Sequence, residues 1–173
     1  TSNEIWYTSA NNTVVDPTNK NFGADILSNT IENGKGVIRF DGPVTEIGVK
    51  AFAECSNLTN IAIPESVTKI DSLAFQLCSG LTSITLPDNV TSIGGFAFSF
   101  CSNLTSITIP QSITSIGPKA FIFCEKLEAF HGKYATEDHR ALVKDGVFLA
   151  FAPAGMTNYS IPEGVTSVGT GAF

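Results

Sequence analysis

Apolar and polar positions recur along this chain with a period of 23 residues. Consecutive units carry the pattern without a gap, at residues 47–69, 70–92 and 93–115. A fourth unit begins at Ile116 and loses the pattern after Phe130, and the last residues, 160–173, resume it. Self-similarity at a fixed period of this length indicates a solenoid, in which each unit forms one coil and stacks on its neighbours.

The second half of each unit predicts a strand. Residues 106–109 read Ser-Ile-Thr-Ile, so hydroxyl side chains alternate with Ile107 and Ile109, which are expected to face inward. A proline follows and ends the strand, because proline has no amide hydrogen to donate to a ladder. We expect short parallel strands that stack laterally in sequence order, at residues 60–63, 83–86 and 106–109.

The first half of each unit predicts a corner and a helical turn. Glycine, or aspartate in one unit, recurs where we expect a corner with positive φ; these positions are Gly48, Asp71, Gly94, Gly117 and Gly169. The Ala-Phe-x-x-Cys segment that follows has the i, i+3 spacing of one helical turn on the outer wall. The expected fold class is an α/β-type repeat solenoid, a right-handed leucine-rich repeat coil with short parallel strands.

The cysteines Cys55, Cys78, Cys101 and Cys124 occupy the same offset in successive units. Coils in register lie about 4.8 Å apart with parallel Cβ vectors, whereas a disulfide needs Cβ atoms within about 3.5–4.5 Å. Metal ligands must converge on one point, which a column of side chains does not do. The spacing therefore favours free thiols in the core over disulfides or a metal site, and no cofactor is expected.

We expect a single continuous domain in four segments: an N-terminal cap at 1–36, repeats at 37–130, a hairpin insertion at 131–159 and the start of a further repeat at 160–173. The first coil of a solenoid has an apolar end that needs covering. Residues 5–8 and 13–15 are expected to pair as a hairpin over that end, with Trp6 in the covering face. Contact between Trp6 and a ligand is the alternative.

The last two segments carry their own signals. Asp145-Gly146 lies between two apolar runs, which is a strong hairpin signal. The chain stops inside the repeat motif at Phe173, and an uncovered coil edge invites pairing with another chain. We therefore expect the natural protein to continue, and this chain to self-associate through its C-terminal coil edge or to fray there.

Candidate chemistry is concentrated in the insertion, where His131, Glu137, Asp138 and His139 lie close in sequence. They could bind a metal or act as acid and base. A solvated loop is the favoured interpretation, because the sequence supplies no nucleophile, oxyanion donors or third ligand beside them. The chain is therefore not expected to be an enzyme.

Charge and hydrophobicity exclude two classes of partner. The net charge is −6 and no basic run occurs, which argues against binding to nucleic acid or to an anionic membrane. The longest apolar stretch, residues 147–156, is short and contains Pro153 and Gly155, so no membrane insertion is expected.

The units, which read IGxxAFxxCxxLTSITIPxSVTS, resemble the repeat of the BspA-like, Treponema-type leucine-rich repeat proteins over residues 37–130 and 160–173. The stretch from Gly132 to Ser167 also resembles a segment that recurs between such repeats. The resemblance implies an extracellular protein of the bacterial cell surface, secreted or anchored. It also implies adhesion to a host or matrix protein or to other cells, with no catalytic residues.

The outward side chains of the expected strands form the candidate binding face: Asn60, Ser83, Thr85, Ser106, Thr108 and His131, together with Ala62 and Ala129. Between Ser72 and Pro118 the only charged side chain is Asp88, so this face is rich in hydroxyls and nearly neutral. Binding of an extracellular protein is the leading hypothesis. The alternative is a carbohydrate-contacting or spacer segment of a longer surface protein.

Overall fold

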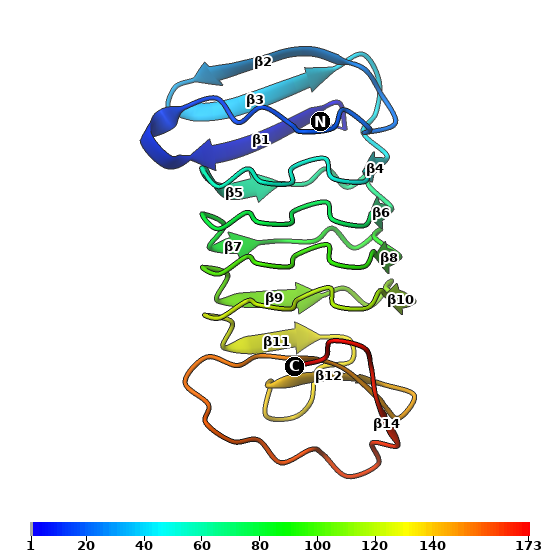
Figure 1. Ribbon diagram of the computed structural model, residues 1–173. Coiled ribbons are helices and arrows are strands. Elements are labelled where there is room, and N and C mark those ends of the chain that lie inside the picture. Colours follow the sequence, from blue (N-terminus) through cyan, green and yellow to red (C-terminus); the bar gives the residue numbers. More distant parts are fainter. Residues whose placement is uncertain (1) are drawn as a thin grey trace.

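The computed structural model describes residues 2–173, which wind into a stack of coils bordered by two parallel ladders (Figure 1). One ladder contains β5 (Leu58–Ala62), β7 (Ser83–Ile84), β9 (Ser106–Ile109) and β11 (Ala129–Gly132). The other contains β4 (Glu46–Ile47), β6 (Lys69–Ile70), β8 (Ser92–Ile93) and β10 (Ser115–Ile116). Parallel stacking in sequence order is confirmed, although β5 starts earlier and β7 ends earlier than expected.

A column of phenylalanine rings fills the centre of the stack. The rings of Phe52, Phe75, Phe98 and Phe121 lie face to face, with centroids 5.3–5.5 Å apart. The column ends in edge contacts, to Phe22 in the cap and to Phe130 below. Because the repeat places one ring in each coil, the rings form a continuous core that no single coil could provide.

The corner glycines do not adopt the expected positive φ, and neither does Asp71. They are required instead by close approach between coils. A Cβ atom on Gly94 would lie 2.3 Å from the amide nitrogen of Ser72, and one on Gly117 would lie 2.4 Å from that of Gly95. Neighbouring backbones are packed too tightly at this point for most side chains.

The outer wall contains no helical turn, contrary to the expectation. Positive φ occurs at two positions of each complete coil, such as Phe96 (φ 57°) and Phe100 (φ 59°), which breaks any helical run. The amide of Phe98 donates to the carbonyl of Ala120 in the next coil at 2.8 Å. Alternate amides of this segment thus bond to the next coil, while those between them, such as the amide of Ser99 to the carbonyl of Phe96, close local turns. The structure is a β-solenoid. The helix assigned in residues 2–173 is the short 3₁₀ turn Ala10–Asn12.

The N-terminal segment covers the first coil as an antiparallel sheet, in the order β2 (Ile26–Glu32), β3 (Lys35–Phe40), β1 (Glu4–Ser9) and then β5. The expected pairing of residues 5–8 with 13–15 does not occur, because β1 pairs with β3 and β5 instead. The backbone of Val15 bonds to side chains: its amide donates to the Tyr7 hydroxyl, and its carbonyl accepts from Asn29.

The Asp145-Gly146 hairpin is confirmed between β12 (Ala141–Lys144) and β13 (Val147–Phe151). Both turn residues have positive φ, 50° and 77°, as a two-residue type I′ turn requires. The edge strand β14 (Ser167–Val168) then pairs in parallel with β13.

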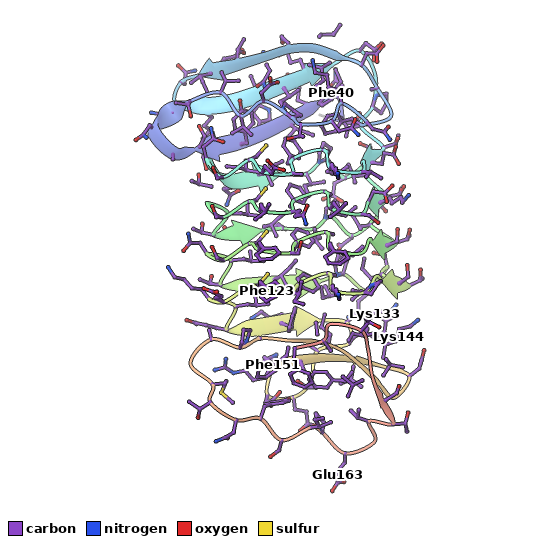
Figure 2. The ribbon with its side chains drawn as sticks, viewed as in Figure 1. Phe40, Phe123, Lys133, Lys144, Phe151 and Glu163 are labelled. Carbon is purple, nitrogen blue, oxygen red and sulfur yellow. The ribbon has the colours of Figure 1, made fainter. Side chains whose placement is uncertain are left out.

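The insertion takes the place of the next coil strand. Two of its lysines supply hydrogen-bond donors to carbonyls that such a strand would otherwise bond. In the regular stack the carbonyl of Thr91 accepts the amide of Thr114. The carbonyl of Thr114 accepts Nζ of Lys144 at 3.0 Å instead, and that of Ile113 accepts Nζ of Lys133 at 2.6 Å. Both ammonium groups lie over the ring of Tyr134, and Figure 2 shows the two lysines side by side at this level.

The four cysteines are free and buried, as the spacing predicts. The thiol of Cys101 donates to the carbonyl of Phe75 in the preceding coil at 3.2 Å, and Cys124 donates in the same way to Phe98. Burial raises the pKa of Cys124 from its ordinary value of 9.0 to about 12.

Phe98→Ala should lower the free energy of unfolding by roughly 3–5 kcal/mol, because it opens a cavity inside the ring column. Phe173→Ala should cost much less, because the side chain of Phe173 is 60% exposed whereas that of Phe98 is 0% exposed. Denaturant unfolding followed by circular dichroism measures both. Equal shifts of the midpoint would contradict a contiguous column.

Stability should fall as the pH rises above about 9. The thiol of Cys124 ionises near 9.0 when unfolded but near 12 when folded, so the unfolded state loses its proton first and is favoured in this window. The loss is at most about 1.4 kcal/mol per pH unit for this thiol. Denaturant titrations at pH 7 and 10 measure it. Cys124→Ala should show a shallower decrease between these pH values, and an identical decrease would contradict the assignment.

Candidate functional site

The outward side chains of β5, β7, β9 and β11 form a continuous surface, which we call the strand face. The register aligns Ser83 with Ser106 and then Ala129, and Thr108 with His131, while a bridge joins Ala62 to Thr85. The structure therefore places the sequence-predicted residues on one surface: Asn60, Ser83, Thr85, Ser106, Thr108 and His131. Ligand binding by these residues stays a prediction.

The polar groups of the strand face are hydroxyls and one amide, which suits hydrogen bonding without strong charge. Thr85 and Thr108 are exposed to solvent. Asn60 Nδ2 donates to Ser83 Oγ of the next coil at 2.8 Å. Such a surface offers donors and acceptors over a wide area but no concentrated catalytic chemistry.

Strand β1 extends the strand face by one further row. Trp6 lies opposite Ala62 and Thr8 opposite Asn60 in the antiparallel register. The side chains of Ile5 and Tyr7 are buried, so these two form the face of β1 that covers the first coil. Trp6, expected in the covering face, points outward instead. The outward orientation of Trp6 is predictable from the strand Glu4–Ser9, since successive side chains of a strand point to opposite faces.

A charged network holds Trp6 in place. Its indole Nε1 donates to Glu4 Oε2 at 3.1 Å, and Glu4 Oε1 accepts from Arg39 Nε at 3.1 Å. The remaining guanidinium nitrogens of Arg39 donate to both oxygens of Glu32, at 2.6 and 2.9 Å. The hydrogen bond from Arg39 lowers the pKa of Glu32. Two carboxylates thus share one guanidinium beside the indole.

Two hollows flank Trp6. The larger, which we call the Trp6 pocket, has a volume of about 350 Å³ and is lined by Ser2, Glu4, Trp6, Ala62, Ile63, Pro64, Glu65 and Ser66. The smaller has a volume of about 120 Å³ and is lined by Trp6, Tyr7, Thr8, Lys35, Asn60 and Ala62. The repeat pattern gives no sign of either hollow, because both form where the cap sheet meets the first coil.

The histidine and acidic cluster is only partly assembled. The rings of His131 and His139 lie 4.8 Å apart, and Nδ1 of His139 is 3.2 Å from the carbonyl of Phe130. Asp138 accepts hydrogen bonds from Thr136 and Tyr159. Burial opposes ionisation of Asp138, but these bonds outweigh it and lower its pKa. Within residues 2–173, no three His, Cys, Asp or Glu side chains are placed to hold a metal ion together.

An exposed apolar row lies on the outer wall, where the repeat places Leu77, Phe100 and Phe123 one coil apart. The rings of Phe100 and Phe123 stack with centroids 4.6 Å apart, and Phe123 is 53% exposed. This row was not among the residues expected to bind a partner, although its 23-residue spacing is visible in the repeat.

A family model described as the BspA type leucine rich repeat region matches residues 23–138, in six copies. No curated protein matches the chain. Among solved structures, a leucine rich repeat protein of T. pallidum is 35% identical with a TM-score of 0.51, over 55% of this chain and 49% of that one.

Two further structures are similar. A leucine rich cell surface protein from Faecalibacterium prausnitzii A2-165 is 29% identical with a TM-score of 0.50, over 84% of this chain and 42% of that one. A leucine-rich repeat protein from Eubacterium ventriosum, at 21% identity and a TM-score of 0.52, shares the fold over 77% of this chain and 49% of that one. The chain spans about half the length of these proteins or less. Among residues 2–173, no helix has the length and apolar content needed to cross a membrane.

Proposed function

The chain belongs to the family of BspA-type leucine-rich repeat proteins, and from this premise we propose that it is a non-catalytic adhesion module of a bacterial cell surface that binds an extracellular host or matrix protein. The similar protein from F. prausnitzii is described as a cell surface protein, which supports an extracellular location. The relatives are leucine-rich repeat proteins, which supports a binding role rather than a catalytic one.

The observation that carries the proposal is the strand face itself. Residues from four strands and the bridge residue Thr85 align there in register, from Trp6 through Ala62, Thr85 and Thr108 to His131. Protein interfaces need a broad surface of moderate polarity, with few charges at the centre. The middle of this row has that character, because its side chains are small and uncharged.

The alternative is contact with glycans, or a spacer role in a longer surface protein. Sugar-binding surfaces use aromatic platforms, and the row along the strand face carries rings only at its two ends, in Trp6 and His131. The hydroxyls of the middle coils could bond to sugars, but they offer no ring for stacking. A protein partner is therefore the better fit.

The double substitution Thr85→Arg and Thr108→Arg should weaken binding to an immobilised matrix protein at least about tenfold, because it places two bulky charges at the centre of the strand face. Surface plasmon resonance against a panel of matrix proteins measures this, beside a glycan array. Thr91→Arg with Thr114→Arg is the matched control, since both threonines are exposed and precede the other ladder. Equal losses in both double variants, or binding to glycans alone, would argue against the proposal.

We also propose self-association through the C-terminal coil edge. Strand β14 is the last strand of its sheet, and the side chains of Val168 and Phe173 are 51% and 60% exposed. Edge strands with exposed apolar side chains pair readily with other chains. Light scattering should show a mass that rises with protein concentration, and Val168→Lys should shift the protein toward the monomer. A strictly monomeric parent protein would contradict the proposal.

A further inference from the structure

We propose that the Trp6 pocket receives an arginine side chain of a polypeptide bound along the strand face. The proposal deepens the proposed function and rests on it for the class of partner. It specifies which residue type of the partner contacts the end of the strand face at which the cap meets the first coil.

The lining of the pocket combines apolar and acidic groups. Ala62, Ile63 and Pro64 contribute apolar surface beside the indole of Trp6, and Glu4 and Glu65 contribute carboxylates. Its volume of about 350 Å³ is at the small end of the range for ligand pockets, which suits a single side chain. A long side chain with an apolar stem and a charged end matches both parts of this lining.

The charge of this region is negative. No lysine or arginine is among the described residues that line the pocket. The nearest guanidinium, on Arg39, is shared between Glu4 and Glu32, so these three groups sum to a charge of −1. Glu65 adds a further −1, and its side chain is exposed. Lys35 lines only the smaller hollow flanking Trp6 and not the Trp6 pocket. The region therefore favours an incoming cation over a neutral or anionic group.

The indole makes arginine the better cation. Trp is the strongest aromatic partner for a cation placed over its ring face. A guanidinium can also stack on the ring while its fork of donors bonds to a carboxylate, whereas an ammonium acts as a point charge. Because the edge nitrogen of Trp6 is engaged by Glu4, the orientation of the ring is set before a ligand arrives.

The position of the pocket makes a polypeptide the occupant. Trp6 begins the row that continues through Ala62, Thr85 and Thr108 to His131, about 19 Å away at the spacing of neighbouring strands. A partner segment lying on this row would meet Trp6 at its end. Trp and Arg are also the residues that most often dominate protein interfaces. A neutral glycan could donate hydroxyl hydrogens to the two carboxylates, but it would leave their negative charge uncompensated.

The intrinsic fluorescence of Trp6 tests the proposal directly, because the chain contains one Trp. The probes are the capped tripeptide acetyl-Gly-Arg-Gly-amide, its lysine counterpart and its citrulline counterpart, which is neutral and nearly isosteric with arginine. We expect a saturable change with the arginine peptide, a weaker one with lysine and none with citrulline. Added salt should weaken the response, because the pocket is open to solvent.

Two glutamate variants provide the comparison. Glu65→Gln should weaken binding of the arginine peptide roughly two- to fivefold, as expected for an exposed ion pair. Glu163→Gln is the matched control and should leave binding unchanged, because Figure 2 shows Glu163 at the end of the molecule opposite the cap. Glu65 is exposed, so its substitution should leave the thermal unfolding of the protein unchanged.

Three outcomes would overturn the proposal: no saturable change up to tens of millimolar arginine peptide, an equal response to the citrulline peptide, or an equal effect of the two glutamate variants. A saturable response of Trp6 to neutral oligosaccharides, without one to the arginine peptide, would assign the pocket to glycans instead. The titration needs no matrix protein. A positive titration with no matrix binding therefore refutes the proposed function alone, and the reverse result refutes this inference alone.

Discussion

Backbone hydrogen bonds between neighbouring coils are the interaction on which the rest of the structure depends. On one side of the coil, the amide of Thr114 donates to the carbonyl of Thr91, and on the outer wall the amide of Phe98 donates to Ala120. Such bonds form only if every coil has the same length. Where the insertion removes the next coil strand, Lys144 supplies the donor that the ladder lacks.

The core follows from this register. Once the coils are aligned, equivalent side chains must lie on top of one another, and the sequence places flat rings and small thiols at the buried positions. The rings of Phe75 and Phe98 lie 5.3 Å apart and nearly parallel, and each thiol from Cys78 onward finds a carbonyl in the coil before it. The same alignment keeps the thiols in a column, which neither a disulfide nor a metal ion can use.

Repetition also limits where recognition can be specific. Coils with the same sequence present the same side chains, so the middle of the strand face is a uniform array of hydroxyls. The distinctive groups lie where the repeat stops: Trp6 with Glu4 and Arg39 at the cap, and the histidine pair of His131 and His139 at the insertion. A partner that spans the face would therefore be selected mainly by its contacts at the two ends.

The sequence by itself determined the coil, its period, the parallel strands and the free thiols, because each depends on spacing along the chain. It also determined which residues share the strand face, since alternation assigns the side of a strand. Only the tertiary structure decided which strands pair in the cap. Pairing of β1 with residues 13–15 and pairing with β3 are both compatible with the sequence, and contacts between residues distant in sequence select β3. It likewise decided that Gly94 is needed for close approach rather than for positive φ, and that Trp6 borders a pocket. Those features arise between segments, where distances in space are independent of distances along the chain.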